Sequence, residues 1–377
     1  GSKSEFDGGV DYLASAYDST RDKFLVVFKD TGSSNVLRGR VGTISDLTIS
    51  WGSAFTINNE NPTNHAGIAS NNAGKFCVAY RKDNGKGATR IIEMAANGSC
   101  TVGDPDENME NNCEWFSVAY STADSRFAIT FQDDGESGRT KGVTVAITSG
   151  TSFSTSPLGE PSPYAARWQN VIYTNSTIDR FVHLANDDTA SSNGTRGVST
   201  SYINASNGNR LTFAQEGEQL RVGDVHPLCG CWDSVNNKVI AFYADGGNSN
   251  YGTVKVGALA NSNEKVEWGS ANLINSGGLQ QNSDHRGNAI CFNPDSGKFA
   301  CVWCENSVNK LFFREGTVSG TSVTFDNTEE VDSSSQGTEV SIIYCSGTKR
   351  YVISYSAGSD SSKGKSVVKR SASSSAN

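Results

Sequence analysis

The residues best suited to bind a ligand are aromatic side chains and carboxylates that recur along the chain. The aromatic and imidazole side chains are Tyr12, His65, Trp115, Trp168, His226 and His285. The acidic series is Asp30, Asp133, Asp187, Asp245 and Glu305, with Asp83 one position out of step. An aromatic ring can cover the apolar C–H face of a sugar, and a carboxylate can accept hydrogen bonds from its hydroxyl groups. The pairing predicts a carbohydrate-binding surface if the fold brings both series to one end.

Each series also has a common structural use. Aromatic side chains at the start of a strand often pack between neighbouring units. An Asp that follows a strand often accepts hydrogen bonds from nearby backbone amides. Both uses stay open at this point, beside the ligand-binding interpretation. We expect Trp115 and Trp168 to be the rings that face solvent.

One acidic loop suggests a metal site. Oxygen-bearing side chains alternate within CTVGDPDENMENNC (100–113), which is the beginning of a calcium-loop spacing. The residues are Asp104, Asp106, Asn108 and Glu110. The loop then departs from the EF-hand pattern, since it has no Gly at the sixth position and Trp115 in place of Glu at the twelfth. Calcium binding and a merely solvated loop are both open, and Cys100 and Cys113 are placed to form a disulfide across it.

An internal repeat must position these residues. A basic residue followed by an aromatic residue or Val recurs at Lys23-Phe24, Lys75-Phe76, Arg126-Phe127, Arg180-Phe181, Lys238-Val239, Lys298-Phe299 and Arg350-Tyr351. The spacings are 52, 51, 54, 58, 60 and 52 residues. Four residues later an aromatic side chain follows in six of the seven copies, and the residues between alternate as in a half-buried strand, for example KFLVVF and KFCVAY.

A second strand precedes each of these strands. It ends seven residues before the aromatic or Val position, at Tyr17, Ala69, Tyr120, Trp232, Phe292 and Tyr344, with Tyr173 displaced by one. A turn rich in Asp, Ser and Asn joins the two strands, as in YDSTRDK, and two more apolar stretches follow, as in RGRVGTI and TISWGS. An open solenoid has shorter periods, and tandem sandwiches need ~100 residues each. Four antiparallel strands in each of seven copies predict an all-β chain that forms a single seven-bladed β-propeller, with almost no helix.

The last copy lacks a fourth strand of its own. The N-terminal SEFDGG (4–9) resembles the outer strands VEWGS and VTFDN, so we expect it to complete the last blade and close the ring. The expected blades are about 10–60, 61–110, 111–162, 163–222, 223–278, 279–334, and 335–370 with 4–9, followed by a linker-like tail at 371–377. In such a blade the first strand begins and the second ends on the same face, where the aromatic and acidic series would meet.

The layout YD-x5-F-x-V-x-F-x-D at 17–30 resembles the repeats of secreted and surface β-propellers from bacteria, marine phages and algae, some of them lectin-like. The resemblance spans about residues 4–370. It implies the propeller fold and an extracellular location, or one on a cell or virion surface.

Catalytic motifs are not found. The chain has no G-x-S-x-G elbow, no H-E-x-x-H pair, no phosphate-binding Gly loop and no S-x-D-x-G-x-x-W box of the kind expected in sialidase propellers. We expect His183, inside a strand, to be a buried or edge side chain and not a catalytic one. Carboxylates contributed by different blades leave no local spacing, so a glycoside hydrolase stays open as an alternative.

The cysteines favour packing over chemistry. Their number, nine, is odd, so at least one has no disulfide partner within the chain. Cys229 and Cys231 share one face of a strand. Cys301 and Cys304 point to opposite faces, so neither pair has zinc-knuckle geometry. Core packing explains Cys77, Cys291, Cys301 and Cys345.

Composition and charge limit the classes of partner that the chain can bind. The net charge of −8 and the pI near 5.2 argue against nucleic acid, and no apolar run is long enough to span a membrane. The start, GSKSEFDGG, lacks the layout of a signal peptide, and four sequons at Asn97, Asn175, Asn193 and Asn204 permit secretion. We expect a non-enzymatic extracellular module that binds carbohydrate or a protein partner, as part of a larger surface, adhesive or fibre assembly. The alternatives are a polysaccharide-active hydrolase or lyase and a structural filament subunit.

Overall fold

The computed structural model describes residues 1–61, 66–107, 109, 112–162, 167–186, 198–214, 219–221, 225–260, 262, 264–280, 287–333 and 337–371. In these ranges the secondary structure is β1 to β31 and three short 3₁₀ helices, η1 (Asp134–Glu136), η2 (Ala205–Asn207) and η3 (Gly358–Asp360). Within the same ranges, no helix has the length and apolar character to cross a membrane. The expected all-β chain with almost no helix is confirmed.

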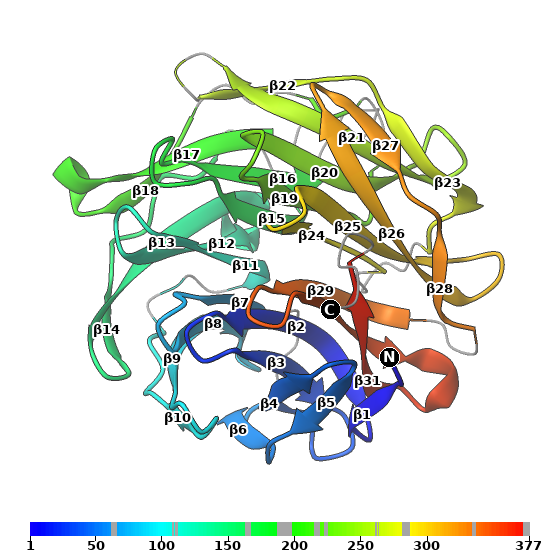
Figure 1. Ribbon diagram of the computed structural model, residues 1–377. Coiled ribbons are helices and arrows are strands. Elements are labelled where there is room, and N and C mark those ends of the chain that lie inside the picture. Colours follow the sequence, from blue (N-terminus) through cyan, green and yellow to red (C-terminus); the bar gives the residue numbers. More distant parts are fainter. Residues whose placement is uncertain are drawn as a thin grey trace.

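Seven antiparallel sheets surround a central axis (Figure 1). Blade 1 contains β2 (Val10–Asp18), β3 (Lys23–Asp30), β4 (Val36–Ser45) and β5 (Thr48–Trp51), with β6 (Phe55–Asn58) also paired to β4. Blade 2 contains β7 (Gly67–Ser70), β8 (Lys75–Arg81), β9 (Gly87–Met94) and β10 (Cys100–Val102). Blade 3 contains β11 (Cys113–Ser121), β12 (Arg126–Asp133), β13 (Arg139–Ser149) and β14 (Ser152–Thr155).

The remaining blades follow the same order from the axis outward. Blade 4 contains β15 (Arg167–Tyr173), β16 (Phe181–Asn186), β17 (Val198–Asn204) and β18 (Arg210–Phe213). Blade 5 contains β19 (Leu228–Asp233), β20 (Lys238–Asp245), β21 (Tyr251–Ala260) and β22 (Lys265–Trp268), with β23 (Asn272–Gly278) paired to β21. Blade 6 contains β24 (Asn288–Asn293), β25 (Lys298–Glu305), β26 (Lys310–Ser319) and β27 (Ser322–Phe325), with β28 (Glu329–Asp332) paired to β26.

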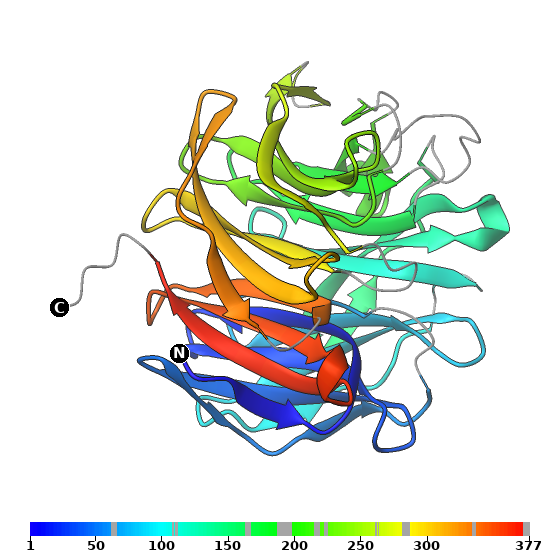
Figure 2. The same cartoon turned by 90° about the vertical axis from the view of Figure 1, so that its right-hand side faces the viewer.

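Blade 7 closes the ring with the start of the chain. Its own strands are β29 (Gly337–Cys345), β30 (Arg350–Ala357) and β31 (Lys363–Arg370), and β1 (Ser4–Asp7) is its outer strand. β1 pairs antiparallel with β31, with Ser4 opposite Ser366. The first and last strands of the chain, β1 and β31, therefore lie side by side, as Figures 1 and 2 show. The prediction that the N-terminal strand completes the last blade is confirmed.

The hairpin between the first two strands of each blade has a recurring construction. In four blades a side chain at the end of the first strand, or two residues beyond it, accepts backbone N–H groups two and three residues later, as Asp18 does from Thr20 (3.0 Å) and Arg21 (2.9 Å). The equivalent acceptors are Asn175, Asp233 and Asn293. In every blade the residue before the recurring Lys or Arg has a positive φ, for example 49° at Asp22 and 56° at Lys349. Short polar side chains are favoured at such positions, which explains the Asp, Ser and Asn content of these turns.

The hydrophobic core is divided into seven clusters, one between each pair of neighbouring blades. The second strand of each blade is buried on both faces. In β3, Leu25 and Val27 face blade 2, whereas Phe24, Val26 and Phe28 face blade 7. This two-residue alternation follows from strand geometry. The core therefore depends on contacts between blades and not on contacts within one blade.

Arginine side chains on third strands join neighbouring blades at the rim. Arg40 on β4 donates to the carbonyl of Gly52 in its own blade (2.8 Å) and to that of Phe6 in blade 7. Arg314 on β26 likewise donates to the backbone carbonyl of Asp326 in its own blade (2.6 Å) and to that of Ile274 in blade 5. A guanidinium group suits this position because it presents several donors in a fixed plane.

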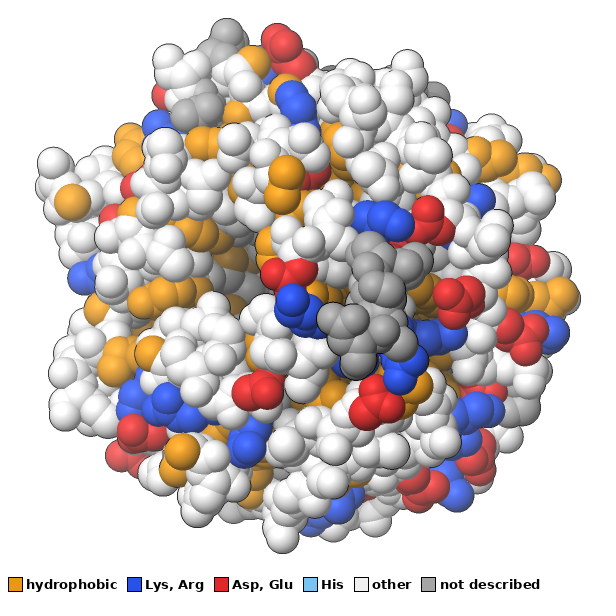
Figure 3. Space-filling model, in the orientation of Figure 1, with side chains coloured by type: hydrophobic (Ala, Val, Ile, Leu, Met, Phe, Trp, Pro, Cys, Tyr) orange, Lys and Arg blue, Asp and Glu red, His pale blue; other side chains and the backbone are white. Residues whose placement is uncertain are grey.

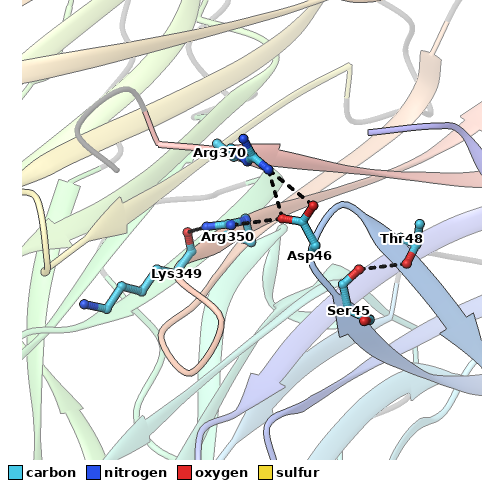
Figure 4. Close-up of polar contacts among 6 residues, drawn as sticks. All are labelled: Ser45, Asp46, Thr48, Lys349, Arg350 and Arg370. Carbon is cyan, nitrogen blue, oxygen red and sulfur yellow. Dashed lines mark hydrogen bonds and ion pairs between the residues drawn. The ribbon is translucent and has the colours of Figure 1, made fainter. Parts of the chain in front are cut away.

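A charged cluster adds to the closure of the ring. Asp46, in the turn between β4 and β5, accepts from Arg350 on β30 (3.2 Å) and Arg370 on β31 (3.0 and 3.2 Å), as Figure 4 shows. The two guanidinium groups hold the pKa of the Asp46 carboxyl below its ordinary value. The cluster is exposed, so salt screens it, and it guides the register of blades 1 and 7 more than it stabilises them.

Truncation of the closing strand should destabilise the whole ring. Phe6 is fully buried and its ring lies 5.3 Å from that of Phe28 and 5.2 Å from that of Trp51. We expect Phe6→Ala to lower the free energy of unfolding by about 3–5 kcal/mol, because it leaves a cavity between blades 7 and 1. Leu273→Ala, at a residue that is 47% exposed, is the matched control. Equal denaturant midpoints for the two variants would contradict this account of closure.

Candidate functional site

The register places the two predicted series at one end of each blade. Val10 at the start of β2 pairs with Asp30 at the end of β3, and Cys113 on β11 pairs with Asp133 on β12. The starts of the first strands and the ends of the second strands therefore share one face. The geometric premise of the sequence analysis is correct for these blades.

The aromatic series is less exposed than the sequence analysis predicts. Trp115 is 6% exposed, so the expectation that it faces solvent is wrong. Trp115 and Tyr12 lie in β-bulges with φ of 55° and 51°, where the alternation of side chains is interrupted and the sequence pattern no longer sets their direction. The half-buried Tyr12 ring lies beneath Lys29, 5.2 Å from Nζ to the centroid, and His226 is 7% exposed.

Several predicted residues lie outside the described part of the chain. They are His65, His285 and Asp187 of the ligand-binding series, and Asn108 and Glu110 of the calcium loop. Trp168 belongs to β15 by its backbone, and its side chain is outside the described part. Ligand binding by these residues stays a prediction.

The described acidic residues of blades 1, 3 and 5 make local contacts at the ends of second strands. Asp30, Asp133 and Asp245 are at most 8% exposed. Each accepts the backbone N–H two residues later, at 3.0, 2.9 and 3.1 Å. Each also pairs with a cation: Arg38 at 2.9 Å, Lys141 at 2.8 Å and Arg221 at 2.7 Å. These carboxylates shape the loops that follow, and binding of a ligand by them is a separate, untested prediction.

The calcium-loop prediction is half covered by the structure. Asp104 is exposed, and Asp106 accepts a hydrogen bond from the Thr155 hydroxyl of blade 3 at 2.9 Å. In the described ranges, three or more His, Cys, Asp or Glu side chains nowhere gather as a metal site would require. Since two of the four proposed ligands lie outside those ranges, calcium binding stays a prediction.

The disulfide that the sequence left open across this loop is not formed in the structure. All nine cysteines are described, and all are thiols, including Cys100 and Cys113. Cys100 is on the outer strand of blade 2, whereas Cys113 begins the inner strand of blade 3. The loop between them crosses from the rim to the axis, which sequence proximity alone does not show. Burial raises the pKa of the Cys100 thiol to about 12.

The central channel is lined by the inner strands of all seven blades and encloses about 170 Å³. Its wall consists of backbone and small or apolar side chains, with a few hydroxyls and amides between blades. The hydroxyl oxygens of Ser15 and Ser341 lie 2.7 Å apart, and the Ser117 hydroxyl accepts a hydrogen bond from the backbone N–H of Val171 at 2.9 Å. The described wall contains no Asp, Glu or His. The alternative of a glycoside hydrolase predicts a pair of carboxylates around this channel, and the described wall does not supply one.

A groove of about 370 Å³ opens beside the hairpin turns of blades 6, 7 and 1, and Asn72 from the hairpin turn of blade 2 also lines it. We call it the hairpin-turn groove. Its aromatic side chains are Tyr17, Phe292 and Tyr344, and its polar ones are Ser19, Asn72 and Ser346. The three rings are half-buried, so each presents part of its surface to solvent. Figure 3 shows one face of the propeller, where hydrophobic side chains appear only in small separate areas among polar ones.

Hydrogen bonds fix the two tyrosines of the groove. Tyr17 donates to Asp22 (2.6 Å) and accepts the backbone N–H of Gly347 in blade 7 (2.9 Å). Tyr344 donates to Asp295 in blade 6 (2.6 Å). Burial, followed by the hydrogen-bonded carboxylate, raises the pKa of both phenols well above the ordinary value. Both hydroxyls therefore remain protonated, and their rings are held in place as a rigid wall.

The sequence contained a signal for this groove. Its three rings occupy the same repeat position, seven residues before the recurring aromatic or Val residue, where the other four blades carry Ala69, Tyr120, Trp232 and, displaced by one, Tyr173. The sequence analysis treated this position only as the end of a strand. The sequence does not show which of these aromatic side chains lie around one cavity, because blades 6, 7 and 1 become neighbours only when the propeller closes.

Comparison with solved structures agrees with the propeller fold. The chain is similar to the BP39L lectin from Burkholderia pseudomallei, with a TM-score of 0.69 and 10% identity over 97% of each chain. It is similar to AofleA from Arthrobotrys oligospora, with a TM-score of 0.55 and 10% identity over 88% of this chain and 90% of that one. A protein from Lactobacillus plantarum matches with a TM-score of 0.56 and 12% identity over 86% of each chain. No protein-family model and no curated protein match the chain.

His183 is buried between neighbouring strands of blade 4, in agreement with the expectation of a buried or edge side chain. Its Nε2 is hydrogen-bonded to the Ser201 hydroxyl, and its ring lies 4.9 Å from that of Phe213. Burial lowers the pKa of His183 from 6.5 to about 3. The side chain is therefore neutral in the folded protein above that pH.

This buried histidine should make the protein less stable in acid. Between pH 3 and 6.5 the unfolded chain binds a proton at His183 that the folded chain does not, so the free energy of unfolding rises with pH. We compare the free energy of unfolding of the parent protein with that of His183→Gln, both measured by urea unfolding. The parent value minus the variant value should increase by about 2–3 kcal/mol from pH 4 to pH 7, since one pKa unit is worth about 1.4 kcal/mol. A difference that does not change with pH would contradict burial of the neutral imidazole.

Proposed function

We propose that the chain is a carbohydrate-recognition module that binds a sugar in the hairpin-turn groove. The observation that carries the proposal is the composition of the groove. Three ring surfaces can cover the C–H face of a pyranose, and uncharged hydroxyl and amide groups stand beside them to bond its hydroxyls. The volume of about 370 Å³ lies in the range of small-molecule sites.

The rigidity of the groove supports the same function. The Tyr17 and Tyr344 hydroxyls are fixed by hydrogen bonds that cross from one blade to the next. A ring that is already immobile loses little conformational entropy when a ligand binds. Weak ligands such as single sugars benefit most from a surface that needs no rearrangement.

The similarity to BP39L supports the proposal of sugar binding. That protein is a lectin by name, and this chain shares its architecture over 97% of both chains. At 10% identity the similarity carries the fold and transfers no individual binding residue. The groove is therefore argued from this chain's own side chains.

The proposal includes the setting expected from the sequence. The module acts outside the cell or on a cell or virion surface, as one part of a larger adhesive or fibre assembly.

Removal of one ring should weaken binding. We expect Tyr344→Ala to weaken binding on a glycan array at least about tenfold, equivalent to 1.4 kcal/mol, because the C–H face of the sugar loses its cover. Tyr120→Ala is the matched control, since Tyr120 occupies the same repeat position in blade 3 and does not line the groove. If the parent binds no glycan, or if both variants lose affinity equally, the groove is not a sugar site.

A small change in the neighbouring turn should have a related effect. A Cβ at Gly347 would lie 2.4 Å from Oδ1 of Asp22 and 2.8 Å from the Tyr17 hydroxyl. We therefore expect Gly347→Ala to displace the Tyr17–Asp22 pair and to weaken glycan binding by about three- to tenfold through lost preorganisation. Gly8→Ala is the matched control, because Gly8 has open space around it, has no positive φ and does not line the groove. Unchanged affinity in Gly347→Ala would show that Tyr17 takes no part.

A further inference from the structure

We infer that the hairpin-turn groove selects its sugar by charge: it accepts neutral and amino sugars and rejects sugars that bear a carboxylate or sulfate. This inference rests on the proposed function and specifies its substrate class. Two observations carry it, the absence of a cation from the described groove wall and the presence of two fixed carboxylates at its edge.

The first observation concerns what binds anions in proteins. Carboxylates and sulfates are held by Arg, Lys or His side chains or by converging backbone amides. The described lining of the groove has hydroxyl, amide, aromatic, aliphatic and thiol side chains and contains no Lys, Arg or His. An acidic sugar would lose its hydration on entry without an opposite charge to replace it, which is unfavourable.

The second observation concerns the carboxylates at the edge. Asp22 and Asp295 are exposed, and each accepts a 2.6 Å hydrogen bond from a tyrosine that lines the groove. These bonds hold the two negative charges at the edge of the groove, Asp22 from blade 1 and Asp295 from blade 6. A negatively charged ligand is repelled by both, whereas the hydroxyl and ammonium groups of neutral and amino sugars can donate to their remaining lone pairs.

The nearby cations do not reverse this field. Arg350 lowers the pKa of Tyr344, but this effect is smaller than the opposite one of Asp295. The Arg350 guanidinium is itself engaged with Asp46 at 3.2 Å. Arg21, beside the Tyr17 hairpin, donates to the carbonyl of Met94 at 3.3 Å and so points toward blade 2. Of the charged groups named here, only Asp22 and Asp295 are hydrogen-bonded to side chains that line the groove.

The test compares matched sugars that differ only in charge. The full chain is titrated with methyl hexosides, with the corresponding methyl hexuronosides and with 2-amino-2-deoxyhexosides at low and high salt. We expect at least about tenfold tighter binding of the neutral and amino sugars than of the uronosides at low salt, and a smaller ratio at high salt because salt screens the two carboxylates.

Two variants separate charge from shape. Asp295→Asn and Asp22→Asn retain an oxygen that can accept the tyrosine hydrogen bond while they remove the charge, so we expect them to bring the uronoside closer to the neutral sugar by about three- to tenfold. Asp360→Asn changes the net charge equally and should leave the ratio unchanged, because Asp360 lies on η3, is paired with Lys365 on β31 and does not border the groove. Uronosides that bind as tightly as the neutral sugars, or ratios that are the same in all three variants, would overturn the inference and leave the proposed function standing. Binding of no sugar of any class would remove the proposed function and this inference with it.

Discussion

The constraint on which the structure depends is that each blade has two apolar faces and can cover neither by itself. A second strand such as β3 directs Leu25 and Val27 to one neighbour and Phe24 and Phe28 to the other. Every blade must therefore have a neighbour on both sides. An open row of blades would leave two such faces in water, and only a closed ring buries all of them.

Closure explains features that appear unrelated in the sequence. Four residues at the start of the chain form the outer strand of the last blade, and the ring of Phe6 fills the core between blades 7 and 1. Arg40 bonds the backbone of that strand from the next blade. The polar contacts are placed where carbonyls would otherwise lack donors, which matters because an unsatisfied buried polar group costs about 1–3 kcal/mol. The apolar clusters supply the stability, and the polar contacts set the register.

The candidate site follows from the same geometry. Hairpin turns of blades 6, 7 and 1 border one groove, and hydrogen bonds of the Tyr17 and Tyr344 hydroxyls link each turn to the one beside it. The bonds that hold the ring together also immobilise the aromatic wall of the groove and fix the carboxylates at its edge. A recognition surface on this fold can thus be rigid without added structure, and its selectivity can change through single turn residues while the blades stay the same.

The sequence by itself determined the blade, its number of copies and its closure. Period-two alternation and recurring turn residues are local properties, and a repeat that cannot bury both faces alone implies a ring. Only the tertiary structure decided which polar and aromatic residues face solvent. Trp115 lies in a β-bulge, where alternation fails, and the groove joins Tyr17 to Phe292 and Tyr344 across more than 270 residues of sequence. Exposure and proximity between blades depend on how complete sheets pack, and no local pattern of residues encodes that packing.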